Sequence, residues 1–342
     1  MRQTLWGLIA STAVALAMVM ATAVPAGAQD MPRSFGVGTN PQGSLFYAAG
    51  SATAKVLTDK MPVPVRVQPY SGTTIILPLI SSGELELGVN NTNDSRLAYR
   101  GLDPFVPAPA IRLASVLFQL RVAIMVDANS DIDSVTDLKG KRVAGEYNAH
   151  LAVWYNATSI MASYGMDWDD VEMVPTANVV TGAQLLIEDK VDAALFALGA
   201  GKVKEANASI PGGIKFLPIN DTPDGIKRMQ EVMPGTYAIN VPEGSTTGVR
   251  EDIVAQGYDV FLNASKHLSD NAVYTLVKTM YDAEEEIQGA FPPLRSFSRD
   301  SMVKTNVTVP YHPGAIKAYE ELGLWSGEMD ALQKKLLSEG MK

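Results

Sequence analysis

The sequence predicts an α/β protein of two lobes, and three observations support this prediction. Strand-like and helix-like segments alternate along almost the whole chain, which is typical of mainly parallel sheets covered by helices. Several of the strand-like segments end in short polar turns. The chain has 342 residues, more than one compact core usually holds, so two lobes are expected.

The first residues have the layout of a secretory signal peptide. Arg2 precedes a long apolar stretch, and Pro25 followed by Ala26-Gly27-Ala28 forms a small-residue cleavage pattern. We therefore expect residues 1–28 to be removed by a cut after Ala28, which would place the mature chain in the periplasm. A retained membrane anchor is the alternative, because the apolar stretch approaches the length of a bilayer span.

Composition excludes several classes of function. The net charge is −9 and no basic runs occur, which argues against nucleic acid or an anionic membrane surface as a partner. Without any cysteine, the chain has no disulfides, zinc–thiolate sites or cysteine nucleophiles. The histidines His150, His267 and His312 lack metal-binding spacing, and no G-x-S-x-G motif is present. No catalytic residue, metal site or cofactor is therefore predicted.

Residues 35–47, FGVGTNPQGSLFY, predict a strand, a turn and a helix that begins near Ser44. The first turn of a helix has backbone N–H groups without intrahelical partners and carries the positive end of the helix dipole. Such a terminus binds anions such as carboxylates. An ordinary connecting loop in which Ser44 only caps the helix is the alternative. The residues of this turn that could contact a ligand are Thr39, Asn40, Gln42, Gly43 and Ser44.

The other elements follow in order. Prolines favour an edge position for the strand over residues 63–70, and Pro78 is expected in the first turn of the next helix. Residues 99–110 are predicted to be a surface connection, and residues 253–262 to be a helix. Further strands are expected at residues 85–89, 112–126, 141–144, 171–174, 191–196, 214–219 and 236–242. Further helices are expected at residues 75–82, 151–164, 181–187, 202–208, 271–287 and 326–337.

Four polar turns follow strands of this pattern, at residues 39–44, 71–74, 90–94 and 147–150. The carboxyl ends of parallel strands share one edge of a sheet, so these turns should converge on a ligand site. The strand over residues 112–126 is long enough to leave one lobe and enter the other. We expect one lobe to comprise residues 29–121 with 242–342, and the other lobe to comprise residues 122–241.

Arg121 is the strongest single candidate for a ligand contact, because a permanently charged side chain inside an apolar run needs a partner. A bound carboxylate matches a guanidinium bidentately, although an edge arginine facing solvent or paired with an acid is the alternative. His150 either contacts the ligand or caps the next helix, and the aromatic side chains either form a pocket wall or belong to the core. The expected ligand contacts are Thr39, Asn40, Gln42, Gly43, Ser44, Tyr47, Ser71, Thr73, Asn91, Asn93, Arg121, Tyr147, Asn148, His150 and Phe196.

Five segments in this order resemble the TAXI family of solute receptors, which serve tripartite ATP-independent periplasmic (TRAP) transporters. They are FGVGTNPQGSLFYAAGSATAKVL, YSGTTIILPLISSGELELGVNNTNDS, SDIDSVTDLKGKRVAGEYNAH, GAQLLIEDKVDAALFALGA and NVTVPYHPGAIKAYEELGLW. The resemblance implies a two-lobed periplasmic binding protein fold of type II, with hinge strands between the lobes. It further implies a monomer that binds a small organic anion, such as glutamate or a dicarboxylate, and delivers it to membrane permease subunits.

One turn departs from the family pattern. Relatives usually have a small, hydroxyl-rich loop where this chain has Glu146-Tyr147-Asn148-Ala149-His150. The bulkier loop suggests that the solute differs from the usual one, since Glu146 would repel a second carboxylate or accept an amino group. A receptor for an ATP-driven importer is the alternative within the same class, and an exported enzyme on the same fold is a third hypothesis.

Overall fold

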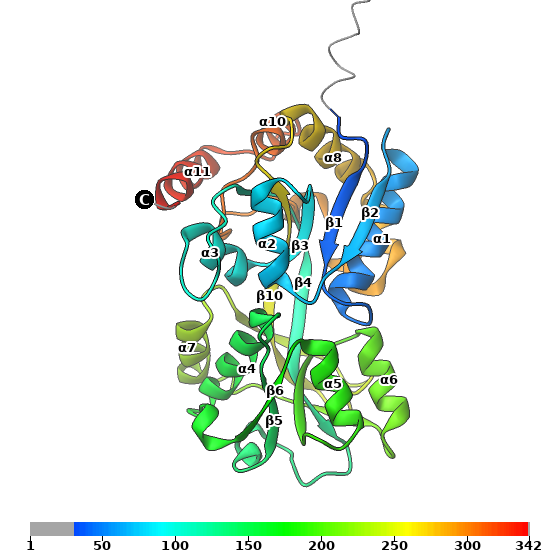
Figure 1. Cartoon of the computed structure of the whole chain (residues 1–342), viewed down its shortest axis with the longest axis vertical. Helices are drawn as coiled ribbons and strands as arrows, with labels where there is room; N and C mark the ends of the chain where they lie inside the picture. Colours follow the sequence, from blue (N-terminus) through cyan, green and yellow to red (C-terminus); the bar gives the residue numbers. More distant parts are fainter. Residues whose placement is uncertain (1–30, 341–342) are drawn as a thin grey trace, which may run out of the picture.

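The structure is a computed structural model that describes residues 31–340. Its strands form one mixed sheet in the order β2-β1-β3-β10-β4-β7-β5-β6, with β8 paired to β4 and β9 paired to β10. Figure 1 shows an upper and a lower lobe, each with helices on both sides of its part of the sheet.

The upper lobe contains β1 (Phe35–Thr39), α1 (Leu45–Lys60), β2 (Val65–Pro69), α2 (Thr73–Ser82), β3 (Leu87–Asn91), α3 (Thr92–Arg100), α8 (Asp270–Asp282), α9 (Glu284–Ala290), η4 (Pro292–Ser296), η5 (Arg299–Ser301), α10 (Pro313–Glu321) and α11 (Gly327–Glu339). The lower lobe contains η2 (Val135–Leu138), β5 (Arg142–Glu146), α4 (Leu151–Ser163), η3 (Trp168–Asp170), β6 (Glu172–Thr176), α5 (Val179–Ile187), β7 (Ala193–Ala197), α6 (Gly201–Ser209), β8 (Ile214–Leu217), α7 (Pro223–Val232) and β9 (Tyr237–Val241).

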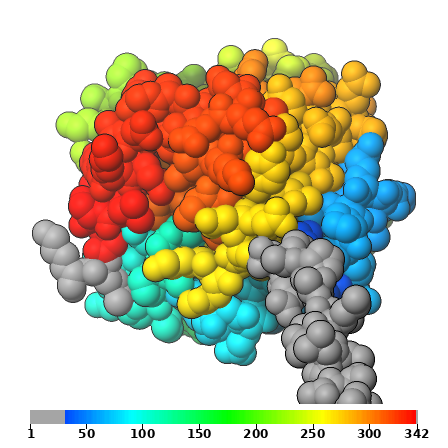
Figure 2. All heavy atoms as spheres, turned by 90° about the horizontal axis from the view of Figure 1, so that it is seen from above, coloured from blue at the N-terminus to red at the C-terminus, as the bar shows by residue number. Residues whose placement is uncertain are grey.

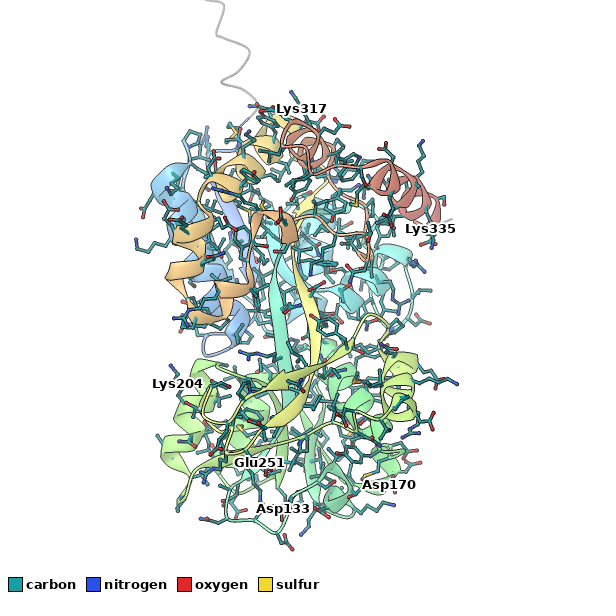
Figure 3. All side chains as sticks on the ribbon, turned by 180° about the vertical axis from the view of Figure 1, so that it is seen from behind. Asp133, Asp170, Lys204, Glu251, Lys317 and Lys335 are labelled. Carbon is teal, nitrogen blue, oxygen red and sulfur yellow. The ribbon has the colours of Figure 1, made fainter. Side chains whose placement is uncertain are left out.

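Two long antiparallel strands connect the lobes, β4 (Ile111–Asp127) and β10 (Ile253–Ser265). The first half of β10 pairs with β9 in the lower lobe, and its second half pairs with β3 in the upper lobe. The far end of β4 pairs with β7 and β8. Both strands are almost wholly buried, so the connection between the lobes is a continuous part of the sheet and not a flexible linker (Figure 3).

The C-terminal segment completes the upper lobe beside the N-terminal strands. Seen from above, the gold and red C-terminal helices lie against the blue and cyan N-terminal elements (Figure 2). Leu113 of β4 donates a backbone hydrogen bond to Pro310, at 2.9 Å, and the Tyr319 hydroxyl donates to the carbonyl of Ala114 at 2.7 Å. The upper lobe is therefore built from both ends of the described chain.

Most of the predicted elements are confirmed, with ends that shift by a few residues. Ser44 is the N-cap of α1, and its hydroxyl accepts a hydrogen bond from the backbone of Tyr47 at 3.1 Å. The strand β2 lies at the edge of the sheet, as its prolines predicted. Gly83 ends α2 with φ of 83°, a left-handed conformation that glycine adopts without steric cost.

The predicted helix over residues 253–262 is wrong, because this segment lies in β10. The strand is flanked on both edges and covered on both faces, so it lacks the apolar–polar alternation of a half-exposed strand. A continuous apolar run of this kind cannot be distinguished from a buried helix by periodicity alone.

Four other expectations need correction. Pro78 lies in the second turn of α2, not the first. Residues 90–94 form no loop, because β3 passes directly into α3 with Asn91 as the N-cap. Tyr99, expected in a surface connection, belongs to α3 and is buried. The helix expected over residues 271–287 is divided at Ala283 into α8 and α9, and α7 was not predicted.

Among residues 31–340, no helix has the length and apolar character needed to cross a bilayer. The predicted signal peptide, residues 1–28, lies outside the described residues. The lobe boundaries at residues 121–122 and 241–242 stay a prediction.

Candidate functional site

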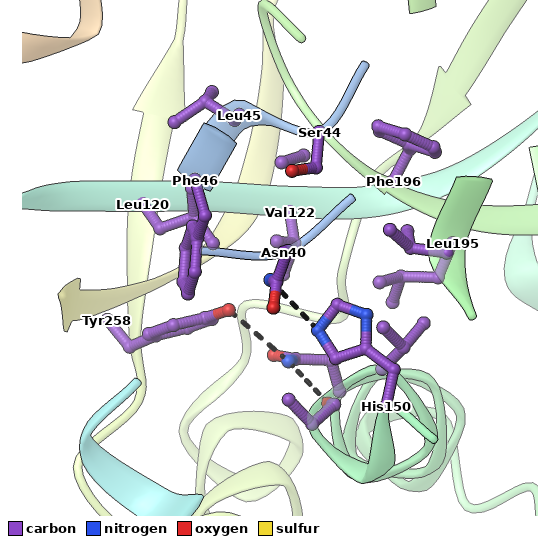
Figure 4. Close-up of a pocket in the computed structure, with 15 residues that line it drawn as sticks. Asn40, Ser44, Leu45, Phe46, Leu120, Val122, His150, Leu195, Phe196 and Tyr258 are labelled. Carbon is purple, nitrogen blue, oxygen red and sulfur yellow. Dashed lines mark hydrogen bonds between the residues drawn. The ribbon is translucent and has the colours of Figure 1, made fainter. Parts of the chain in front are cut away.

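A small cavity of about 40 Å³ lies between the lobes (Figure 4). Its walls come from the turn after β1, the first residues of α1 and α4, and the strands β4, β7 and β10. The residues that line it are Asn40, Ser44, Leu45, Phe46, Leu120, Val122, His150, Ala152, Val153, Asn156, Val179, Leu195, Phe196, Ala197 and Tyr258.

Three helices begin at this cavity. Ser44 and Leu45 start α1, His150 is the N-cap of α4, and Val179 is the first residue of α5. The His150 side chain makes no capping hydrogen bond, so α4 does not satisfy its first N–H groups in that way. Ser44 caps α1 and Asn178 caps α5, so part of their first-turn N–H groups is already satisfied. The positive ends of three helix dipoles still lie near one small volume, which favours a negatively charged group there.

The side chains of Asn40 and His150 meet across the cavity. The Asn40 Nδ2 atom lies 3.1 Å from His150 Nε2, and both side chains are buried (Figure 4). Burial lowers the pKa of His150 to about 3, so the imidazole is neutral at physiological pH. In this orientation the amide donates to Nε2, which places the imidazole proton on Nδ1. Among the described residues, neither His150 Nδ1 nor Asn40 Oδ1 has a hydrogen-bond partner.

Asn156 and Tyr258 extend the polar side of the cavity. Asn156 Nδ2 donates to the carbonyl of Ala152 at 2.7 Å and lies 3.5 Å from the Tyr258 hydroxyl, while its Oδ1 has no partner within residues 31–340. Burial raises the pKa of Tyr258, so its hydroxyl stays protonated. The other walls are apolar, and none of the described lining residues is an arginine or lysine. A bound anion would therefore be held by helix ends and neutral donors.

The lobes contact each other directly on the sides of the cavity. The backbone of Lys202, in α6, donates to the carbonyl of Gly43 at 3.1 Å. The backbone of Leu151, in α4, lies 3.4 Å from the Thr74 hydroxyl in α2. The turn after β1 and the start of α2 thus contact helix starts of the lower lobe, which is the arrangement of a closed two-lobed receptor.

A buried acidic group, Asp94, lies at the start of α3, near enough to the cavity residue Tyr258 that, besides burial, its charge raises the pKa of that hydroxyl. The Thr73 hydroxyl donates to the carboxylate of Asp94, whose backbone N–H donates to Asn91 Oδ1 at 2.8 Å. Burial raises the pKa of Asp94 to about 6, although the two hydrogen bonds lower it. The other carboxylate oxygen of Asp94, the Nδ2 atom of Asn91 and that of Asn93 have no partner among the described residues.

The structure brings four of the predicted contacts together at the cavity: Asn40, Ser44, His150 and Phe196. Gly43 takes part through its carbonyl in the contact between lobes. Thr73 and Asn91 make hydrogen bonds with Asp94, and Asn93 accepts one from the guanidinium of Arg96.

The other predicted contacts do not line the cavity. Gln42 is exposed and lies 3.4 Å from the Tyr47 hydroxyl, and Asn148 is exposed beside Glu146. Tyr147 is a core residue with no exposed surface. Thr39 is buried at the end of β1, and Ser71 is half-buried in the turn before α2. Arg121 lines a different groove. Their roles in binding stay predictions.

Sequence reasoning missed Asn156 and Tyr258. Asn156 interrupts an apolar helix, LAVWYNATSI, and a buried amide in such a helix is the signal that could have identified it. Tyr258 lies in the segment that was wrongly predicted to be a helix, so its side-chain direction could not be inferred. In the part of the chain that the structure describes, no three potential metal ligands cluster.

The fold and this cavity define a class of protein. An α/β chain of two lobes, crossed by two strands and with a cavity between the lobes, is a periplasmic binding protein of type II. Two solved structures share the fold. An ancestral arginine-binding protein bound to arginine is 15% identical, with a TM-score of 0.50, over 78% of this chain and 100% of that one. A protein from Bordetella bronchiseptica is 14% identical, with a TM-score of 0.54, over 91% and 95%.

Residues 37–323 match the model of the NMT1-like family, and the chain belongs to this family. The family corresponds to the TAXI-type solute receptors, so the resemblance noted in the sequence is confirmed. The protein is a solute-binding protein of a transport system, not an enzyme.

Proposed function

We propose that the protein is the extracytoplasmic receptor of a TRAP transporter and that it binds a small organic anion in the cavity between its lobes. An amino acid or a dicarboxylate such as glutamate is the expected class of solute. The receptor acts as a monomer in the periplasm after removal of residues 1–28, and it delivers the solute to membrane permease subunits. Family membership supports the transport role.

The observation that carries the anion assignment is the meeting of three helix N-termini at one cavity that no carboxylate lines. Asn40 and His150 add hydrogen-bonding atoms without partners inside the described chain. A carboxylate accepts hydrogen bonds from backbone N–H groups, so the helix ends and His150 Nδ1–H are matched donors. The nearby Asp94 oxygen would accept a hydrogen bond from an amino or hydroxyl group of the same solute.

The size of the cavity indicates that the lobes move during binding. A volume of about 40 Å³ holds only a few water molecules. A dicarboxylate needs more room, so the contacts of Gly43 with Lys202 and of Thr74 with Leu151 must open to admit it. The solute then shifts the equilibrium between the open and closed arrangements of the lobes toward the arrangement that it binds more tightly.

The test is a thermal-shift screen of amino acids, keto acids and dicarboxylates, followed by calorimetry on the best solute. Ligands that bind only the native state raise its melting temperature. We expect at least one carboxylate to do so and its neutral amide analogue to fail. Equal stabilisation by the amide would contradict the role of the helix ends, and no response to any carboxylate would contradict the anion assignment.

Asn40→Ala should weaken the binding of that solute by about 10- to 100-fold, because it removes a hydrogen-bonding group from a buried site. Asn271→Ala is the matched control, since Asn271 is an exposed asparagine at the start of α8. Unchanged affinity of Asn40→Ala would remove this residue from the site.

A further inference from the structure

A second and larger hollow lies on another side of the junction between the lobes. Its volume is about 650 Å³, within the range of small-molecule sites. The upper lobe contributes η4 and the residue before it, the lower lobe contributes α6 and β9, and β4 crosses the floor. Leu45 and Leu120 line both this groove and the cavity, so they form the wall between the two.

Three cations line this groove: Arg121 in β4, Lys204 in α6 and Arg295 in η4. Arg121 lies between Leu120 and Val122 in the strand, and neighbouring side chains of a strand point to opposite faces. Val122 lines the cavity, whereas Arg121 lines only the groove. Lys204 lies in the lower lobe, close to the junction (Figure 3).

None of the three side chains has a hydrogen bond or an ion pair within residues 31–340. The groove lining, as far as it is described, contains no aspartate or glutamate either. Arg121 is half-buried, and burial alone lowers its pKa, but a guanidinium keeps its charge. Three uncompensated positive charges in one concave surface attract anions, even on a chain with a net charge of −9.

Uncharged donors complete the site. Ser245, Thr246 and Thr247 line the groove from the turn after β9. The Thr246 hydroxyl lies close to Gly199, whose φ of 84° forms the turn before α6. Hydroxyl groups beside guanidinium and ammonium groups form a common set of donors for carboxylate oxygens.

We propose that this groove is a second binding site, specific for a small multivalent carboxylate and separate from the solute cavity. One carboxylate of the ligand pairs with Arg121 on the floor, and the others reach Lys204 and Arg295 on the two lobes. A flat acidic protein surface would reach the exposed Lys204 and Arg295 but not a half-buried floor residue, which favours a small ligand.

Isothermal titration calorimetry of the full chain with citrate tests the proposal, at low ionic strength and with acetate and sodium chloride as controls. We expect citrate to bind and acetate not to bind. Arg121→Gln should weaken citrate binding at least tenfold, and Lys204→Gln and Arg295→Gln several-fold each. These last two residues are exposed, so their variants should fold like the wild type.

Two control variants distinguish binding in the groove from binding elsewhere on the chain. Lys334→Gln removes an exposed lysine of α11, far from the groove, and should bind citrate like the wild type. Asn40→Ala changes the solute cavity and should also leave citrate binding unaltered. Citrate binding that is absent, that survives all three groove variants, or that is lost in Asn40→Ala would overturn the proposal. The outcome is independent of whether any solute binds the cavity.

Discussion

His150 and Asn40 show how two ordinary residues become specific through burial. Each comes from a polar turn, and the sequence could predict that these turns converge because parallel strands end at one edge. It could not predict that the two side chains lie 3.1 Å apart, since this distance depends on how far the lobes close. The alternative that His150 caps α4 is half right: the residue is at the N-cap position, but its side chain faces Asn40.

Burial of His150 should make stability dependent on pH. Its pKa is about 3 in the folded protein and 6.5 in the unfolded chain. As the pH falls from 6.5 toward 3, the unfolded chain binds a proton that the folded protein does not, so the free energy of unfolding decreases. Between pH 7.5 and 5 this amounts to about 2 kcal/mol. Asp94, whose pKa is raised, acts in the opposite sense and loses stability as the pH rises from about 4 to 6.

Urea unfolding of the wild type and His150→Gln at both pH values isolates the effect of this histidine, because Asp94 is common to both proteins. We expect the wild type to lose about 2 kcal/mol more than His150→Gln between pH 7.5 and 5. His267→Gln, which removes an exposed histidine, is the control. Equal losses in wild type and His150→Gln would show that the imidazole is solvated.

Arg121 illustrates the limit of sequence reasoning at this scale. The sequence predicted an unusual arginine in an apolar strand, and the structure confirms that strand. Which face the side chain occupies depends on strand register, and a shift of one residue reverses every side chain. The arginine therefore lies in the groove with Lys204 and Arg295, not beside Asn40 and Ser44.

At the scale of elements, local signals predicted the turns and helix ends better than they predicted the long strands. Ser44 and Gly83 act through their own backbone and side-chain chemistry, so their roles are visible in a short window of sequence. The strand β10 owes its conformation to pairing with β3, β4 and β9, which are distant in the chain. Such tertiary contacts override local propensity, and no window of residues 253–262 contains them.

Pro78 in α2 offers a test of helix stability. A proline in the second turn cannot donate a hydrogen bond, and its ring crowds the carbonyl four residues earlier, that of Thr74. A proline inside a helix lowers the free energy of unfolding by about 3 kcal/mol. Because proline also restricts the unfolded chain, it returns about 1 kcal/mol of that loss. Pro78→Ala should therefore raise the free energy of unfolding by about 1–2 kcal/mol.

Chemical denaturation measures this change, with Pro223→Ala as the control. Pro223 is the first residue of α7, a position where proline costs little, so its replacement should give no comparable gain. A stability of Pro78→Ala at or below that of the wild type would show that packing around the proline ring outweighs the missing hydrogen bond.

At the scale of the molecule, Gly72 is required by the approach of the lobes. Its φ of 174° is extended backbone that any residue adopts, so conformation does not select glycine here. A Cβ at this position would lie 2.0 Å from the carbonyl oxygen of Ala149 in the other lobe, and 2.7 Å from His150 Cα. The sequence alone could not show this, because residues 72 and 149 meet only through closure.

Gly72→Ala should therefore fold normally but hold the lobes apart. We expect a larger radius of gyration by small-angle X-ray scattering, and an affinity for the solute reduced about tenfold or more, because the closed population falls. Gly289→Ala, in α9 with no atom near the added methyl group, is the control. Scattering curves that superimpose for Gly72→Ala and wild type would contradict the closure account.

The passage of β4 and β10 through both lobes has a consequence for biogenesis. The upper lobe needs β10 and the C-terminal helices, which are synthesised last, to pair with β3 and β4 near the N-terminus. A nascent chain that lacks these residues cannot complete either half of the sheet, and contacts so far apart in sequence form slowly. The order of elements thus delays completion of the sheet until synthesis has passed β10, and the export proposed above would benefit from that delay.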